Sequence, residues 1–186
     1  FILFLGTQVG LTMVVVNLPQ IASEILKVSV NYAGLLIVVP AGIGALAGSV
    51  FIPRFLKKGM RKRSIIGLGL IVLLVSLLGI VFLIPHLPTT FRVIINPVLT
   101  IAAGLGFIAV NIPTLTFLQE VTPLELRGRV FGNMWFLITI ITVFPVLLSG
   151  AVAEFFGVRA LLVILSLFIL FALFILKRKE HLPRWQ

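Results

Sequence analysis

Residues 64–84 read SIIGLGLIVLLVSLLGIVFLI, an apolar run in which Ser64 and Ser76 are the only polar side chains. An α-helix needs about 20 such residues to cross the ~30 Å hydrocarbon core of a membrane. With this run, six apolar stretches predict membrane-spanning helices, at about 1–22, 31–53, 64–84, 93–117, 130–150 and 158–176. The chain is 60% hydrophobic and 11% charged. We therefore predict an all-α membrane protein with a single six-helix transmembrane domain over residues 1–186.

The basic residues are concentrated on alternate connections between these stretches. Of the 15 Lys and Arg residues, only Lys27, Arg92 and Arg159 lie in the first, third and fifth connections. The others lie in the second connection, the fourth connection and the C-terminal tail: Arg54, Lys57, Lys58, Arg61, Lys62, Arg63, Arg127, Arg129, Lys177, Arg178, Lys179 and Arg184. Because cytoplasmic loops accumulate Lys and Arg, we expect both termini in the cytoplasm and a multi-pass protein of the cell (plasma or inner) membrane. This distribution argues against a nucleic-acid partner and favours contact with the lipid bilayer.

Polar side chains and prolines are concentrated in the first, second, fourth and fifth stretches. Pro19, Pro40, Pro113 and Pro145 lie there, and each removes one backbone hydrogen-bond donor. Because polar groups in hydrocarbon need partners or water, we expect these four helices to line an interior and the third and sixth to face lipid. The candidate substrate-cavity residues are Gln8, Thr12, Asn17, Asn111, Thr114, Asn133 and Trp135. Such amides and hydroxyls either bind a substrate or join two helices, and the sequence leaves both roles open.

An internal repeat is indicated by two similar tetrapeptides. VNLP at 16–19 matches VNIP at 110–113, 94 residues later, and the order of two polar stretches followed by an apolar one also recurs. Three helices per unit is an odd number, so the two units would cross the membrane in opposite directions. The sequence therefore predicts two inverted three-helix repeats, an arrangement typical of secondary transporters.

Small residues recur at helical spacing in the first two stretches, at Gly6, Gly10, Gly42, Gly44, Ala45, Ala47 and Gly48. Spacings of four residues allow two helix backbones to approach closely. We interpret these residues as packing contacts between helices.

The segment TPLELRGRVFG at 122–132 carries a family resemblance. Its Pro-x-Glu-x-Arg-Gly-Arg pattern resembles the segment between the fourth and fifth helices of a six-helix half in the major facilitator superfamily of transporters. The FFGVR segment at 155–159 looks most like the second half of drug-efflux members, including the macrolide-exporter branch. The resemblance implies a cytoplasmic gate or topology motif at Glu125, Arg127, Gly128 and Arg129.

The second connection resembles the same family only in part. Gly59, Arg61, Lys62 and Arg63 are similar to the latter part of its Gly-x-x-x-Asp-Arg-x-Gly-Arg-Arg motif. Ile52 and Leu56 stand at the leading Gly and the Asp, and the chain contains no Asp. We assign Gly59, Arg61 and Lys62 to the gate or topology motif, without the Asp-dependent contact between helices that the family implies.

Ionisable groups that would support catalysis are absent from the centres of the predicted helices. The carboxylates and histidines lie at helix ends or in connections: Glu24, Glu120, Glu125, Glu154, Glu180, His86 and His181. Ser49, Ser76, Ser149 and Ser166 lie in or beside helices without an embedded base, and the chain has no Cys. We therefore predict no enzyme, no metal site and no cofactor, and expect any proton-coupling residue to lie outside this chain.

The resemblance implies the C-terminal six-helix half of a transporter that works by alternating access. We expect proton-coupled export of small hydrophobic or amphipathic compounds, with a second six-helix half as partner. Phe1 begins inside an apolar stretch, so we expect a further segment before it. Two alternatives stay open: a half-size transporter that forms a homodimer, and a non-transporting protein that interacts with another membrane protein.

Overall fold

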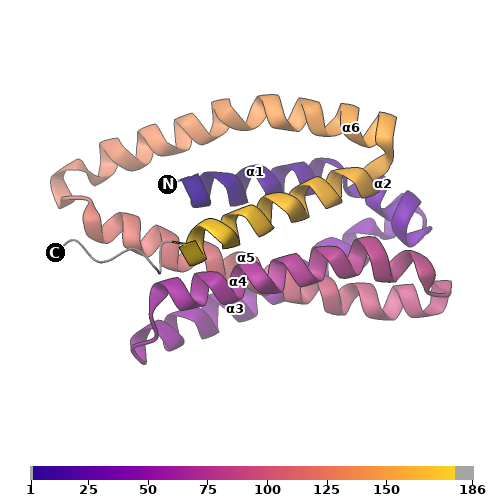
Figure 1. The fold of residues 1–186 in the computed structure, drawn as a ribbon, viewed down its shortest axis with the longest axis horizontal. Helices are drawn as coiled ribbons and strands as arrows, with labels where there is room; N and C mark the ends of the chain where they lie inside the picture. Colours follow the sequence, from indigo (N-terminus) through magenta and orange to yellow (C-terminus); the bar gives the residue numbers. More distant parts are fainter. Residues whose placement is uncertain (1, 179–186) are drawn as a thin grey trace.

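The computed structural model describes residues 2–178, which form helices joined by short connections and contain no strand (Figure 1). The elements in chain order are α1 (Ile2–Val16), α2 (Leu18–Gln20), η1 (Ile21–Leu26), η2 (Val30–Tyr32), η3 (Gly34–Val38), α3 (Val39–Lys57), α4 (Lys62–Leu78), η4 (Gly79–Leu83), η5 (Ile84–His86), α5 (Thr89–Val121), η6 (Leu124–Leu126) and α6 (Arg127–Arg178). Residue 1 and residues 179–186, among them Lys179, Glu180, His181 and Arg184, lie outside the described residues. The all-α prediction is confirmed.

Membrane-spanning segments follow from helix length and composition. Four segments are long and apolar enough to span a membrane, and a fifth is a helix pair bent by 57°. They are, in chain order, Ile2–Val16 with Leu18–Leu26 (the bent pair), Val30–Lys57, Lys62–His86, Thr89–Val121 and Leu124–Arg178. The last is a pair of antiparallel arms, 127–156 and 158–178, since the chain reverses near Gly157 (Figure 1). Counted with the two arms of α6 as separate segments, these are six helical segments, and a single six-helix transmembrane domain over residues 1–186 stays a prediction.

The reversal in α6 depends on Gly157, which has φ 81° and ψ 154°. Only glycine adopts this region readily, because a Cβ would collide with the backbone. Glu24 Oε2 accepts a hydrogen bond from the backbone N–H of Val158 at 3.1 Å, and so provides a partner for the first free donor of the second arm. This contact joins η1 to the start of that arm.

The bend in the first span lies at Asn17, between α1 and α2. Pro19 has no N–H group, so it cannot continue the helical hydrogen bonds toward Val15. Pro113 and Pro145, in contrast, lie inside the unbroken helical parts of α5 and α6. Among these prolines, only Pro19 therefore accompanies a break in its helix.

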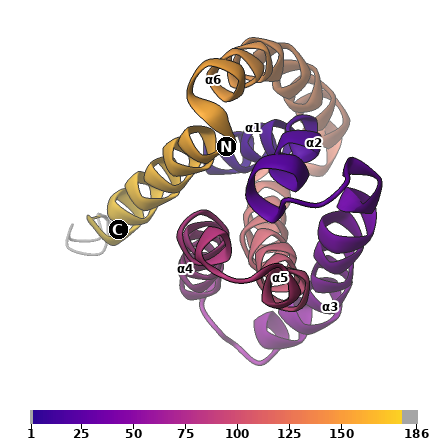
Figure 2. The same cartoon turned by 90° about the vertical axis from the view of Figure 1, so that its right-hand side faces the viewer.

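Two groups of helices make up the fold (Figure 2). In one group α5 lies between α3 and α4, and in the other α1 packs against both arms of α6. Phe4 of α1 contacts Trp135 of the first arm edge to face, with ring centroids 5.9 Å apart. Gly6 of α1 lies against Phe168 of the second arm. The first helix of each predicted repeat thus packs against the second and third helices of the other repeat, which joins the two repeats into one domain.

The contact between α3 and α5 is a close approach of two backbones. A Cβ atom at Gly44 would lie 1.9 Å from the carbonyl oxygen of Ile101, and one at Gly104 would lie 2.0 Å from that of Ala41. Real Cβ atoms do not approach other atoms this closely, so only glycine fits at either position. The packing interpretation of Gly44 is therefore confirmed, whereas a Cβ at Gly42 would meet nothing within 4 Å.

The two ends of the molecule differ in character (Figure 1). The basic end holds the α3–α4 and α5–α6 connections, the start of α1 and the end of α6. The distal end holds η1 and η5, with Gly157 beside Glu24 of η1, and the largest apolar cluster lies there, with Ile25, Ile84 and Val158 fully buried. The distal end is therefore closed by apolar packing.

Arg92 is the buried cation of the distal end, with 8% of its surface exposed. Its guanidinium donates to the carbonyl oxygens of Leu87 at 2.7 Å, Pro85 at 2.9 Å and Ile25 at 3.4 Å. These carbonyls lie near the ends of η5 and η1, where helical partners are missing. The planar fork of the guanidinium suits several acceptors at once, so Arg92 joins three segments.

Candidate functional site

A cavity of about 410 Å³ lies between the two helix groups. Thr7 of α1, with Asn96 and Thr100 of α5, are the only polar side chains among the described residues that line it. All the other lining residues are apolar, and none of the described lining residues carries a charge. Such a cavity fits an apolar ligand with few polar groups.

Several lining residues of the cavity are also exposed on the described surface. Leu11 and Val15 of α1 and Val38 of η3 line it, yet they are 41%, 52% and 50% exposed. Leu70 of α4 and Leu162 of the second arm of α6 line it as well. The third and sixth helices, which we expect to face lipid on most sides, therefore also border the space between the helix groups.

Pro40 explains how Asn96 is held. Because Pro40 has no N–H group, the carbonyl of Leu36 lacks the donor that an α-helix would place at position 40. Asn96 Nδ2 of α5 donates to that carbonyl oxygen at 2.9 Å. Asn96 is 1% exposed, and its Oδ1 is buried without a hydrogen-bond partner among the described residues.

The two threonines of the cavity use their hydroxyl protons within their own helices. Thr7 Oγ1 donates to Phe4 O at 2.8 Å, and Thr100 Oγ1 lies 3.0 Å from both Asn96 O and Pro97 O. A hydroxyl has one proton and two lone pairs, so both side chains retain acceptor capacity only. Toward a ligand, the two threonine side chains therefore offer acceptors and no free donor.

None of the seven cavity residues predicted from the sequence lines this cavity: Gln8, Thr12, Asn17, Asn111, Thr114, Asn133 and Trp135. Asn17 instead joins two helices, because its Nδ2 donates to Met13 O at 2.8 Å and to Ser149 Oγ at 3.0 Å. Thr12 and Thr114 donate to the carbonyls four residues before them. Gln8 is half-buried on α1.

Asn111 is the counterpart of Asn17 in the predicted repeat, and its side chain makes the same kind of hydrogen bond within its own helix. Its Nδ2 donates to Phe107 O at 2.9 Å, again four residues earlier, while its Oδ1 is buried without a partner among the described residues. Asn133 and Trp135 are exposed on the first arm of α6, and Trp135 turns its ring toward Phe4. A role for these residues in a shared cavity remains a prediction.

The sequence contained a signal for Asn96 and Thr100, two cavity residues that it was not used to predict. Asn96, Thr100 and Gly104 are spaced by four residues and so lie on one face of α5. Pro40 also indicated that the carbonyl of Leu36 lacks a backbone donor at position 40, but it did not indicate which side chain would donate to that carbonyl. The partner across α3 and α5 depends on tertiary contacts, which spacing alone does not give.

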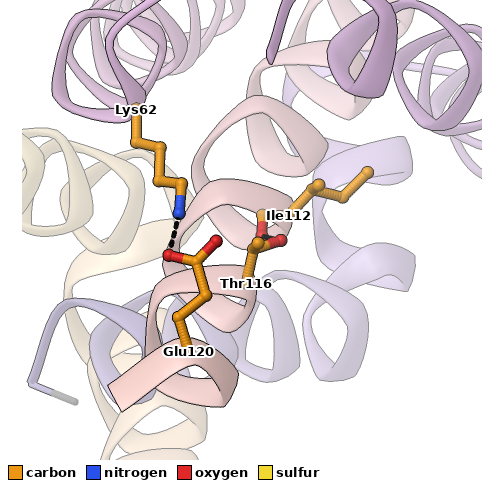
Figure 3. Close-up of polar contacts among 4 residues, drawn as sticks. All are labelled: Lys62, Ile112, Thr116 and Glu120. Atoms are coloured by element: carbon orange, nitrogen blue, oxygen red, sulfur yellow. Dashed lines mark hydrogen bonds and ion pairs between the residues drawn. The ribbon is translucent and has the colours of Figure 1, made fainter. Parts of the chain in front are cut away.

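Lys62 gains a tertiary partner at the basic end (Figure 3). It forms an ion pair with Glu120, which joins the start of α4 to the end of α5. Thr116 lies one turn before Glu120 and donates to Ile112 O at 2.8 Å (Figure 3). The side chains of Lys62 and Glu120 are 32% and 57% exposed, so the pair is a surface contact.

The other residues of the gate or topology motif lie in connections of the basic end. Gly59 has φ 84°, which favours glycine, and Arg61 is exposed and directly precedes α4. Arg127 Nε donates to Thr122 O at 3.2 Å, which holds the turn before α6. Glu125, Gly128 and Arg129 are exposed. A gating role and a topology role remain equally open for them.

Carboxylates and histidines lie away from the cavity within residues 2–178. Glu24 binds the start of the second arm of α6, Glu125 and Glu154 are exposed, and His86 Nδ1 lies 2.6 Å from Phe82 O. No group of three or more metal-ligating side chains occurs in the described part of the chain. The candidate serines Ser49, Ser149 and Ser166 donate to carbonyls of their own helices.

Comparison with protein families gives one match: the model of the Major Facilitator Superfamily matches residues 1–186. No curated protein and no solved structure matches the chain.

Proposed function

Because the chain belongs to the Major Facilitator Superfamily, a family of membrane transporters, we propose that it is the C-terminal six-helix half of a secondary transporter in the cell membrane. Its substrates would be small hydrophobic or amphipathic compounds, exported by alternating access as in the drug-efflux members that the sequence resembles. Both termini would lie in the cytoplasm, at the basic end. Transport without covalent chemistry would make the protein a non-enzyme.

The apolar cavity between the two helix groups carries this proposal. Its volume of about 410 Å³ is within the range of sites for drug-sized molecules, and the charged side chains that would select ionic substrates do not line it among the described residues. Burying a charged compound in such surroundings would cost several kcal/mol without a partner. The cavity therefore favours neutral or weakly polar substrates.

The exposed lining residues of α1 and η3 support a second wall for the cavity. Leu11, Val15 and Val38 line the cavity and are about half exposed, and a second six-helix bundle would cover them. Inverted-repeat transporters place their substrate between such bundles. The second bundle would be another part of the same transporter or a second copy of this chain.

Coupling to protons would depend on the second bundle. A coupling residue needs to gain and lose a proton inside the membrane. The described carboxylates and histidines of this chain lie at helix ends or connections, so the proposed coupling residue belongs to the partner bundle.

Transport in proteoliposomes tests the proposal. The transporter is reconstituted with N-phenyl-1-naphthylamine, a neutral apolar dye, and dye movement is followed by fluorescence with and without a pH gradient. Ala172→Trp places a large ring in the cavity, whereas Ala151→Trp places it on an exposed position of the first arm of α6. We expect the first variant to abolish transport and the second to retain it.

Three outcomes would change the proposal. Equal transport by both variants would exclude the cavity as the substrate path. Transport that persists after an ionophore collapses the pH gradient would exclude proton coupling. Transport by this chain alone, with a dimer mass in native mass spectrometry, would favour the homodimer, and a lack of transport by any assembly would leave the non-transporting alternative.

A further inference from the structure

A groove at the basic end lies between the start of α4 and the end of the second arm of α6 (Figure 1), and the proposed function does not use it. Its volume is about 200 Å³. Arg63, Ser64 and Lys177 are the polar side chains among the described residues that line this α4–α6 groove, and the other described lining residues are apolar. A ligand that matches the groove therefore carries both an anionic group and an apolar body.

The α4–α6 groove is formed by one face of α4 and the last two turns of α6. Arg63, Gly67 and Ile71 are spaced by four residues and so lie on the same face of α4. Gly67 leaves the hollow, because a Cβ atom there would already lie 3.6 Å from Leu176 Cδ2, at ordinary contact distance. A side chain larger than a methyl group at position 67 would therefore occupy the space between the two helices.

The length of the α4–α6 groove matches one leaflet of a membrane. From Arg63 to Ile71 the helix rises about 12 Å, at about 1.5 Å per residue, and half of the ~30 Å hydrocarbon core is about 15 Å. Leu68 and Ile71 line the groove and are 54% and 42% exposed, so its apolar part is accessible from the surface of the described residues. An acyl chain that lies against them would extend from the basic rim toward the centre of the membrane.

The rim of the groove holds its charged and polar groups. Arg63 Nη2 donates to Leu176 O, near the end of α6 where carbonyls lack helical partners, and this bond keeps the guanidinium at the groove. Lys177 is exposed, and no described carboxylate forms an ion pair with it. Ser64 is exposed as well. A phosphate oxygen accepts hydrogen bonds from ammonium, guanidinium and hydroxyl groups, so the rim suits a phosphate.

We propose that the α4–α6 groove is a binding site for an anionic phospholipid. The phosphate lies at Arg63, Ser64 and Lys177, and the start of one acyl chain lies against Leu68 and Ile71. Basic pockets between membrane helices bind anionic headgroups in this way. A free phosphate would use only the rim and leave the apolar part of the groove without a ligand, so the lipid accounts for both parts.

The test is a lipid titration of the full-length protein in detergent micelles, in which native mass spectrometry gives the dissociation constant of the first bound lipid. Dioleoylphosphatidylglycerol is compared with dioleoylphosphatidylcholine, which has the same chains but a headgroup without net charge. We expect the anionic lipid to bind about 25-fold more tightly, since each of the two basic residues contributes about 1 kcal/mol, or about fivefold. Lys177→Gln should reduce this preference to about fivefold.

Three controls separate the groove from the basic surface around it. Lys58→Gln removes another exposed lysine of the basic end that does not line the groove, and should leave the preference unchanged. Gly67→Leu fills the groove and keeps every charge, so it should weaken binding of the anionic lipid about tenfold, the effect of exposing about two methylene groups. sn-Glycerol 3-phosphate carries the phosphate without acyl chains, and should not displace the lipid.

Equal affinity of the unaltered protein for the two lipids would overturn the inference. Equal losses in Lys177→Gln and Lys58→Gln would also overturn it, because they would indicate a general attraction to the basic surface. Unchanged binding by Gly67→Leu, with the circular dichroism of the parent, would exclude the apolar part of the groove. Displacement by sn-glycerol 3-phosphate would identify a site for a free phosphate instead, and this measurement decides the matter even if Gly67→Leu does not fold.

Discussion

Gly44→Ala provides a sharp test of the contact that joins the two repeats. Its new Cβ would lie 1.9 Å from Ile101 O, whereas ordinary contacts begin at 3.4 Å. Because the obstructing atom belongs to the backbone, α3 and α5 would have to separate by about 1.5 Å. A gap of 0.5–1 Å already removes a quarter to a half of the dispersion attraction, and packing is the main attraction between membrane helices. We expect a loss of about 3 kcal/mol, the upper end of overpacking effects.

The measurement is the free energy of unfolding in mixed detergent micelles, followed by circular dichroism as SDS is added. Gly42→Ala is the matched control, since its Cβ would meet nothing within 4 Å and it lies two residues away on the same helix. Gly104→Ala, whose Cβ would lie 2.0 Å from Ala41 O, should resemble Gly44→Ala. The reasoning is refuted if Gly44→Ala stays within 0.5 kcal/mol of the parent or if Gly42→Ala is equally unstable.

Three further predictions concern the ends of the molecule and use the same unfolding assay. Arg92→Lys should lose about 2–4 kcal/mol, because a single ammonium cannot replace the fork that donates to three carbonyls; stability equal to the parent would contradict this role. Gly157→Ala should lose about 1–3 kcal/mol from its φ of 81°, whereas Gly150→Ala, with open space around its Cβ, should not be destabilised. A double-mutant cycle of Lys62→Gln and Glu120→Gln should give a coupling of about 0.2–1 kcal/mol that falls at high salt; a coupling above 2 kcal/mol would mean that the pair is shielded from water.

Local sequence properties predict the helices well in this chain. The six apolar stretches recur as helical segments because a membrane requires each spanning segment to pair its own backbone groups. The structure extends several of them, for example 93–117 to Thr89–Val121, since helices continue beyond the hydrocarbon layer. It also divides the first span near Asn17. Pro19 indicated a distortion of this helix, but the sequence does not give the bend angle between α1 and α2.

The candidate site shows where local reasoning stops. Asn17 and Asn96 both carry amide side chains and lie in polar stretches of the sequence. Of the two, only Asn17 was predicted from the sequence to line the cavity. In the structure Asn17 bonds Ser149, 132 positions later, and so joins two helices. Asn96 reaches the carbonyl that Pro40 leaves unpaired, and lines the cavity. The two roles differ only in which helix faces each amide.

The sequence by itself determined the membrane class and the helical fold, because these depend on hydrophobic length. Short motifs determined the family, and the odd number of helices in each predicted repeat determined that the two repeats run in opposite directions. Tertiary structure alone decided that the first helix of each repeat packs against the other repeat, that Lys62 meets Glu120, and that Asn96 lines the cavity and donates to Leu36 O. The physical reason is that packing and hydrogen bonding between distant segments depend on which helix faces meet. Periodicity fixes the faces of each helix but not their partners.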